Sequence, residues 1–276
     1  QMKRISEEVS EAISQVFITM QVKKLDDTAR RLIEEHRFNL ELGIGYYSLD
    51  LYPPEYFREL SRWLRKLKLR LTVHAPFNEL FLGAPDSKIR KASVDRLNRA
   101  FAVIRYFRPE SVVLHLNYEE KRFRFVYDDW FSFIIPNLKR YAEKCRMMGS
   151  FLSIENVYEE TPEAMNHVFR SLRGYAAGHC VDVGHIHAFS QTDLRHWLKV
   201  LGRYVRQFHL HDNGGGRDAH GPIGSGSIDF DYLRDFIASM RRKPLITLEP
   251  HREEHIWETL EGYVRFRLNE AMRKRR

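Results

Sequence analysis

Residues 111–117 read SVVLHLN and residues 151–157 read FLSIENV, two short segments rich in apolar and β-branched residues. Between them, residues 131–148 read FSFIIPNLKRYAEKCRMM, in which apolar residues recur every three to four positions. Short apolar runs are typical of buried strands, and a period of three to four is typical of an amphipathic helix. The stretch therefore predicts a strand, a helix and a second strand parallel to the first.

The same alternation of short apolar and longer amphipathic segments recurs along the chain of 276 residues. The apolar segments are Val16–Gln21, Phe38–Ile44, Arg70–Pro76, Ser111–Asn117, Phe151–Val157, Ala176–His185, Val205–Asp212 and Leu245–His251. The segments that predict helices are Asp26–His36, Pro54–Lys66, Lys88–Phe107, Phe131–Met148, Pro162–Leu172, Asp193–Leu201, Asp231–Met240 and Glu254–Arg276. Nearly continuous apolar strands indicate a parallel sheet with both faces covered.

Eight such units match the size of one (β/α)8 barrel, which typically has about 250 residues. An open, doubly wound sheet is the alternative, but no glycine-rich dinucleotide or Walker motif follows the first apolar segment. The sequence also contains no internal repeat, low-complexity block or linker. We therefore predict an α/β protein with a single (β/α)8 TIM barrel domain over residues 1–276.

Composition indicates a compartment and the kind of metal ligand. No run approaches the roughly 18 to 20 consecutive apolar residues of a membrane helix, and residues 1–10 are charged, unlike a signal peptide. Cys145 and Cys180 show no paired spacing or zinc-ribbon pattern. We expect a soluble, cytoplasmic protein with no membrane partner, in which nitrogen and oxygen atoms bind any metal.

The net charge is +8, from 45 basic and 37 acidic residues. Residues 273–276 contribute four of the positive charges, and the chain without them has 41 minus 37, or +4. This balance is compatible with a phosphate-bearing partner, and a frayed basic C-terminal tail explains it as well.

Polar residues interrupt or end six consecutive apolar segments, at the strand ends where barrels place active sites. His74 and His115 each lie near the end of one segment, and either alone fits a hydrogen-bonded core histidine as well as a metal ligand. Glu155 lies in the apolar sequence LSIEN, where an unpaired charge would cost several kcal/mol. Its carboxylate therefore needs a metal or another cationic partner.

The later segments add further side chains of types that bind metals. These are Asp182 and His185 in the sixth segment, His209 in the seventh, Asp218 and His220 in the following loop, and Glu249 in the eighth. Packing alone would favour Val, Ile or Leu in the strands. Together, these residues indicate a metal site at the carboxyl ends of the strands.

Three residues near these candidate ligands are candidates for binding substrate. His187 and His211 lie two residues beyond a candidate ligand and would share its face by strand periodicity. Both also fit a supporting position behind a ligand, or a plain surface or loop position. In the loop NGGGR at residues 213–217, the backbone would approach a substrate oxygen or phosphate, with Arg217 as a charged clamp.

Two neighbouring motifs resemble those of a known superfamily: FHLHDN at residues 208–213 and DAHGPIGSGSIDF at residues 218–230. Four shorter motifs follow in the expected order and on the expected strands: HAPF at 74–77, IEN at 154–156, DVGH at 182–185 and EP at 249–250. From the second strand onward the chain resembles the xylose isomerase-like barrels. That superfamily includes sugar and sugar-phosphate isomerases and epimerases together with endonuclease IV.

The resemblance implies nine metal ligands in three sites. They are His74, His115 and Glu155 in one site, Glu155, Asp182, His209 and Glu249 in the central site, and His185, Asp218 and His220 in the third, with Glu155 bridging two metals. Endonuclease IV has such a trinuclear zinc centre, whereas the isomerases and epimerases keep the central four ligands, usually with manganese or magnesium. One to three divalent ions, zinc or manganese, are therefore implied. Glu155 and Glu249 would then move the substrate proton, and His185 would contact a substrate oxygen.

Departures from endonuclease IV separate the two activities. Residues 16–20 read VFITM in place of the His-Val-Ser type first strand of that enzyme. Residues 43–50, GIGYYSLD, contain no Arg or Lys to hold DNA phosphates, where that enzyme inserts a polar, basic loop. Basic residues after the strands are few, chiefly Arg217. Phe77 stands where a tyrosine would stack beside an abasic gap, which keeps the stacking surface but not the hydroxyl.

We therefore expect a metal-dependent isomerase or epimerase acting on a small sugar, sugar phosphate or polyol, with Phe77, His187, His211 and Arg217 in contact with substrate. The alternative is an endonuclease IV-like hydrolase of abasic DNA, which would make nucleic acid the partner. A third alternative is a non-catalytic metal-binding barrel. The sequence leaves the exact substrate and the oligomeric state open.

Overall fold

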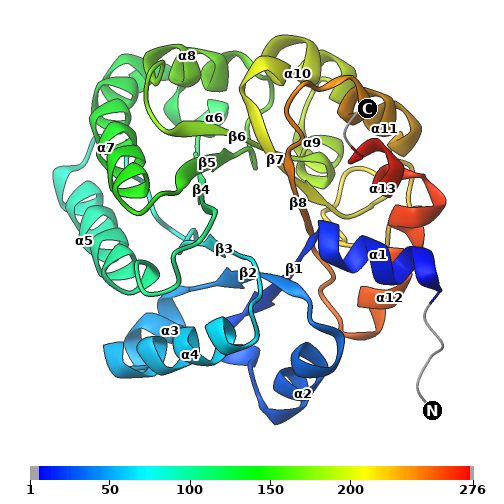
Figure 1. Cartoon of the computed structure of the whole chain (residues 1–276). Coiled ribbons are helices and arrows are strands. Elements are labelled where there is room, and N and C mark those ends of the chain that lie inside the picture. The colour runs from blue at the N-terminus through cyan, green and yellow to red at the C-terminus, as the bar shows by residue number, and fades with distance from the viewer. Residues whose placement is uncertain (1–5, 274–276) are drawn as a thin grey trace.

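A computed structural model describes residues 6–273 of the protein. Eight parallel strands close into a barrel in sequence order, with β1 paired to both β2 and β8 (Figure 1). The strands are β1 (Phe17–Gln21), β2 (Asn39–Gly43), β3 (Leu71–His74), β4 (Ser111–His115), β5 (Phe151–Glu155), β6 (Ala177–Asp182), β7 (Val205–Leu210) and β8 (Leu245–Leu248). The predicted (β/α)8 barrel is confirmed.

Helices connect each strand to the next and surround the sheet (Figure 1). The α-helices of the described chain are α1 (Glu7–Gln15), α2 (Asp27–His36), α3 (Tyr46–Leu51), α4 (Pro54–Lys66), α5 (Ser87–Ile104), α6 (Glu120–Phe123), α7 (Tyr127–Met147), α8 (Glu163–Ser171), α9 (Val183–Phe189), α10 (Leu194–Leu201), α11 (Phe230–Ser239), α12 (Glu254–Arg265) and α13 (Leu268–Ala271). Its 3-10 helices are η1 (Val22–Lys24), η2 (Arg124–Val126) and η3 (Gly202–Tyr204). No helix within residues 6–273 is long and apolar enough to cross a membrane.

The sixth strand is shorter than the expected segment Ala176–His185, because Asp182 ends it and caps α9. The Asp182 carboxylate accepts a hydrogen bond from the backbone amide of His185 at 2.7 Å. This contact satisfies an amide of the first helical turn that has no partner within the helix. His185 therefore projects from the start of a helix and not from a strand.

The helix expected over Glu254–Arg276 is also interrupted. Arg267 has a φ angle of 58°, and this left-handed residue separates α12 from α13. Of the basic tail at residues 273–276, only Arg273 lies within the described residues, and its Nη2 atom lies 3.0 Å from Glu11 Oε2. The segment 43–50, expected as a loop, enters helix α3 at Tyr46.

The interior of the barrel is partly polar, whereas the outer face of the sheet packs against the helices. In β2, Leu40 belongs to the hydrophobic core, and the adjacent Glu41 faces the barrel interior with no exposed surface. Gln207 Nε2 donates a hydrogen bond to Glu41 Oε2 at 2.7 Å, and Ser111 Oγ donates one to Gln207 Oε1 at 2.6 Å. Gln207 precedes His209 by two residues, so this polar layer underlies the candidate ligands.

Candidate metal centre

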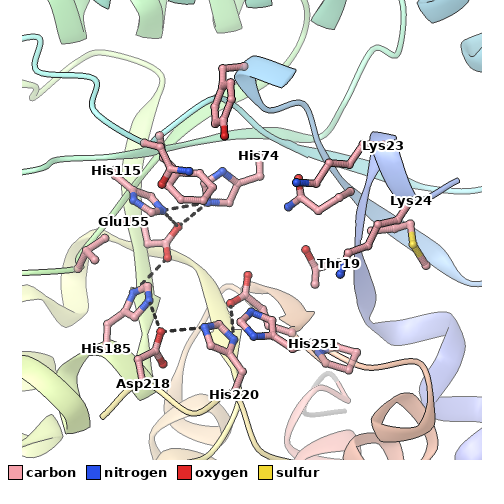
Figure 2. A pocket seen from close by; sticks show the side chains of 18 of the residues that line it. Thr19, Lys23, Lys24, His74, His115, Glu155, His185, Asp218, His220 and His251 are labelled. Carbon is pink, nitrogen blue, oxygen red and sulfur yellow. Dashed lines mark hydrogen bonds and ion pairs between the residues drawn. The ribbon is translucent and has the colours of Figure 1, made fainter. Parts of the chain in front are cut away.

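The strand register brings the expected ligands to one end of the barrel. His115 lies beside Glu155 in the β4–β5 pair, and Asp182 lies beside His209 in the β6–β7 pair. Seven of the nine expected ligands line one cavity of about 1210 Å³ (Figure 2). Asp182 and His209 have no exposed surface. They contact the cavity-lining ligands His185 and Glu249, respectively. The structure thus gathers all nine residues in one region.

His74, His115 and Glu155 form a compact group. His74 Nε2 lies 3.1 Å from both His115 Nε2 and Glu155 Oε2, and His115 Nε2 lies 3.3 Å from the same oxygen. Bonds of about 2.0 to 2.1 Å in a tetrahedral zinc site place neighbouring ligand atoms about 3.3 Å apart. The three atoms therefore have nearly the spacing that a single metal ion requires.

His209 is the centre of the second group. Its Nδ1 atom lies 3.1 Å from Glu249 Oε1, 3.5 Å from Glu155 Oε1 and 4.0 Å from Asp182 Oδ2. Glu155 directs its other oxygen, Oε2, toward His74. The two oxygens of Glu155 thus face two different groups, which is the placement that a bridging carboxylate requires.

The loop after β7 supplies Asp218 and His220 to a third group. Asp212 shapes this loop, because its carboxylate accepts hydrogen bonds from backbone amides that include Gly224 N at 2.9 Å. His220 Nε2 lies 2.8 Å from Asp218 Oδ2, and His185 Nε2 lies 3.4 Å from the same oxygen. His185 from α9 and His220 from the loop therefore both lie close to the carboxylate of Asp218.

His211 belongs to this third group. Its Nε2 atom lies 3.0 Å from Asp182 Oδ1, and its Nδ1 atom lies 3.5 Å from Asp218 Oδ1. Its ring stacks on the ring of His220 with 3.8 Å between centroids. A side chain at Gly184 would overlap the His211 ring, so a glycine is needed there. His211 is therefore buried among the candidate ligands.

Charges within the cluster depend on one another. Burial alone would raise the pKa of Glu155, but the imidazoles of His209 and His115 hold it well below its usual range. Burial acts against a charged His185, but Asp182 and Asp218 raise the pKa of its imidazole well above the ordinary value. The carboxylates thus require positive charge close by, which imidazolium groups or a divalent cation supply.

The donor set fits a divalent metal ion. Four buried side-chain atoms of the cluster lack a hydrogen-bond partner: His209 Nδ1, His211 Nδ1, His220 Nδ1 and Asp218 Oδ1. An unpaired buried polar atom costs free energy, and coordination of a metal would satisfy it. Imidazole nitrogen and carboxylate oxygen are ligands of both zinc and manganese.

Glu41 is a residue of the site that the sequence analysis missed. Its Oε1 atom lies at the ion-pair distance of 3.0 Å from His209 Nε2, the ring nitrogen that faces away from the other carboxylates. Its Oε2 atom accepts hydrogen bonds from Thr72 Oγ1 at 2.9 Å and Thr247 Oγ1 at 3.0 Å. A charged residue in an apolar strand is the signal that pointed to Glu155, and the same signal was present at Glu41.

Glu159, in the segment after β5, was also missed. Its side chain is 2% exposed, and its carboxylate accepts hydrogen bonds from Val157 N at 2.6 Å and Tyr118 N at 3.1 Å. Burial raises the pKa of Glu159 to about 7. The residue ties the segments after β4 and β5 together beside the cavity.

Of the residues expected to contact substrate, Phe77 lines the cavity, where its ring stacks on His115 with 4.5 Å between centroids. Arg217, His187 and His211 are not part of the cavity lining within residues 6–273. Arg217 is exposed on the surface of its loop. His187 lies on α9, where residues two apart point in different directions, and its Nε2 atom lies 2.8 Å from Ser227 Oγ.

The cavity is also more basic than the sequence analysis expected. Lys23 and Lys24 of η1, Arg122 of α6 and Arg252 after β8 all line it. The expectation that Arg217 is the chief basic residue near the strand ends is therefore wrong. The sequence argument considered the segments after β2 and β7 and overlooked those after β1, β4 and β8.

The sequence model of the xylose isomerase-like TIM barrel family matches residues 34–266, and the chain belongs to this family. The uncharacterized protein MJ1311 of Methanocaldococcus jannaschii is 25% identical over 232 residues, which are 79% of this chain and 76% of that protein. The TTHB071 protein of Thermus thermophilus, in a crystal soaked with zinc chloride, is 22% identical with a TM-score of 0.75 over 94% of this chain and 100% of that one. A D-tagatose 3-epimerase-like protein is 20% identical with a TM-score of 0.77 over 92% of this chain and 99% of that one. The resemblance inferred from the motifs is confirmed.

Proposed function

We propose that the protein is a divalent-metal-dependent isomerase or epimerase of a small sugar, sugar phosphate or related polyol. The observation that carries the proposal is a pair of carboxylates on the cavity, Glu155 and Glu249, which lie 3.5 and 3.1 Å from His209 Nδ1. One carboxylate removes the proton from the carbon next to a sugar carbonyl, and the other returns a proton. Return to the former carbonyl carbon gives an isomer, and return to the opposite face of the same carbon gives an epimer. The similarity to the D-tagatose 3-epimerase-like protein supports this class of substrate.

The metal in this proposal is zinc or manganese, with one to three ions. The ligands would be His74, His115 and Glu155 for one ion, Glu155, Asp182, His209 and Glu249 for the central ion, and His185, Asp218 and His220 for the third. When bound, the ion acts as a Lewis acid that polarises a carbonyl oxygen of the substrate. The zinc-soaked crystal of the TTHB071 protein supports zinc as one candidate.

The side chains of the cavity wall orient the sugar for proton transfer. His185, whose position is set by the Asp182 cap, would contact a substrate oxygen. Phe77 offers an apolar face to the carbon side of a sugar ring. Glu155 lines the cavity, so its carboxylate is within reach of a bound sugar and of the solvent that enters the cavity.

A second candidate function is endonuclease IV-like hydrolysis at abasic sites in DNA. Two ligand groups beyond the central one favour it, because a single-metal isomerase needs only the central four residues. These groups are His74, His115 and Glu155, and His185, His211, Asp218 and His220. Against it, the segment 43–50 forms the start of α3 and contains no basic residue for DNA phosphates.

Solvent deuterium exchange tests the proposal. The metal-loaded protein is incubated in D2O with a panel of ketoses and aldoses, phosphorylated and unphosphorylated, and the signal of the proton next to the carbonyl is followed by NMR. We expect metal-dependent exchange with at least one sugar and little incision of an abasic duplex. Incision without exchange would establish the nuclease, and metal binding without either activity would establish a non-catalytic barrel.

A further inference from the structure

We infer that Lys23 and Lys24 form a subsite of the cavity that binds the terminal phosphate of a sugar phosphate. This inference rests on the proposed function and narrows its substrate class. Both lysines belong to η1, directly after β1, and line the same cavity as the metal centre. In Figure 2 they lie on the side of the cavity away from His115, His185 and Asp218, and their side chains extend toward its centre.

The segment after β1, which carries both lysines, contains no candidate metal ligand. The ligands come from β3 to β7, from the start of α9 and from the segments after β7 and β8, whereas β1 and the segment after it contribute none of them. Because β1 pairs with β8, the segment that follows β1 is a neighbour of the segment that follows β8. Arg252 lies in that second segment and lines the same cavity. Lys23, Lys24 and Arg252 thus line the cavity from two neighbouring segments, those after β1 and β8.

The two lysine side chains lack an anionic partner within the protein. Within residues 6–273, neither Nζ atom lies within 4.0 Å of a carboxylate oxygen. The Nζ atom of Lys23 lies 5.8 Å from the centroid of the Tyr47 ring, a contact that positions the ammonium group without neutralising it. By contrast, Arg96 elsewhere on the surface pairs with Asp50 at 2.6 Å. Both lysines are therefore available to an anionic ligand.

Acidic residues also line the cavity, and two of them, Asp26 and Glu119, have other partners. Asp26 Oδ1 accepts a hydrogen bond from Ala29 N at 2.8 Å as the cap of α2. Glu119 pairs with Arg122 at 3.6 Å. Asp26 and Glu119 thus have other partners and form no ion pair with Lys23 or Lys24 within residues 6–273.

The size of the cavity accommodates a substrate that spans both regions. Its volume of about 1210 Å³ is larger than the roughly 300 to 1,000 Å³ of ordinary small-ligand pockets. A phosphate group accepts strong, charge-assisted hydrogen bonds from ammonium groups. Binding of the phosphate at this non-reacting end would hold the carbonyl end of the sugar at the metal centre. The free energy of phosphate binding would thus help to orient the substrate for proton transfer. Barrels frequently bind phosphate with segments after their last strands, and closure of this barrel places the segment after β1 beside them.

The test compares K23Q/K24Q with K88Q/K91Q, a control that removes the same charge from exposed positions of α5 outside the cavity lining. Titration calorimetry measures binding of inorganic phosphate, pentose and hexose phosphates and the matching neutral sugars to the metal-loaded protein. We expect K23Q/K24Q to bind the phosphorylated ligands roughly 10- to 100-fold more weakly. Its affinity for neutral sugars and its metal content should not change. K23R/K24R should retain phosphate binding because it keeps the charge.

Three results would overturn the inference: no binding of any phosphate by the wild type, no loss in K23Q/K24Q, or an equal loss for neutral sugars. An abasic duplex that binds more tightly than every sugar phosphate, and loses that binding in K23Q/K24Q, would assign the lysines to DNA instead. Lysine-dependent phosphate binding without proton exchange would support the subsite and refute the isomerase. Exchange of sugar phosphates that is as efficient in K23Q/K24Q as in the wild type would support the isomerase and refute the subsite.

Discussion

Replacement of Glu41 with glutamine tests whether its carboxylate holds His209 in the state that binds metal. Glu41 has no exposed surface, and its Oε1 atom lies 3.0 Å from His209 Nε2. A carboxylate at this distance favours a proton on Nε2 and leaves the lone pair on Nδ1, the atom that faces Glu155 and Glu249. Glutamine keeps the shape but lacks the charge, and its amide group favours the tautomer in which Nδ1 carries the proton.

Loss of such a supporting carboxylate typically lowers metal affinity by about 10- to 100-fold, or about 1.4 to 2.7 kcal/mol. The glutamine oxygen is still able to accept the hydrogen bonds that Thr72 and Thr247 now donate to Glu41 at 2.9 and 3.0 Å. The metal-free variant should therefore remain folded, and the effect should appear in metal binding.

Competition with a chromophoric chelator measures the zinc affinity of Glu41→Gln, and circular dichroism follows unfolding of the metal-free protein. Thr247→Val is the matched control, because it removes one hydrogen bond to the same carboxylate and leaves the charge in place. We expect the control to bind zinc much more tightly than Glu41→Gln. A folded Glu41→Gln protein with the zinc affinity of the wild type would refute the reasoning.

Three further predictions concern the bridging role of Glu155, the buried carboxylate of Glu159 and the basic C-terminal tail. Glu155→Gln should lower both metal content and proton exchange, because the two oxygens of Glu155 face two ligand groups; unchanged metal occupancy by elemental analysis would exclude the bridge. Burial raises the pKa of Glu159 from 4.5 to about 7, so its contribution to stability is complete below about pH 4.5 and is lost as the pH rises through about 7. Urea unfolding of metal-free protein should therefore show the wild type losing about 3 kcal/mol relative to Glu159→Gln across this range, and parallel pH profiles would contradict the assignment. Deletion of residues 274–276, which keeps the ion pair between Arg273 and Glu11 at 3.0 Å, should weaken nonspecific DNA binding because it removes three positive charges, without changing sugar exchange; unchanged DNA binding would place the contact elsewhere.

The sequence by itself determined the alternation of strands and helices, and with it the barrel. The strand expected at Ser111–Asn117 is observed over Ser111–His115, and the one expected at Phe151–Val157 is observed over Phe151–Glu155. Such segments are predictable because hydrophobic periodicity acts between neighbouring residues. The candidate ligands were also predictable from the sequence, because a charged or imidazole side chain stands out in an apolar strand whatever it contacts in the fold.

Only the tertiary structure decided what those side chains contact. The position of His187 depended on the cap at Asp182, which turns an expected strand into a helix and changes the direction of every following side chain. Glu41 and His209 meet across the barrel interior at 3.0 Å although they are far apart in the chain. Lys23 enters the cavity because β1 closes the barrel against β8. Barrel closure and strand register set these contacts, and they depend on the packing of all eight strands, which no local pattern in the sequence records.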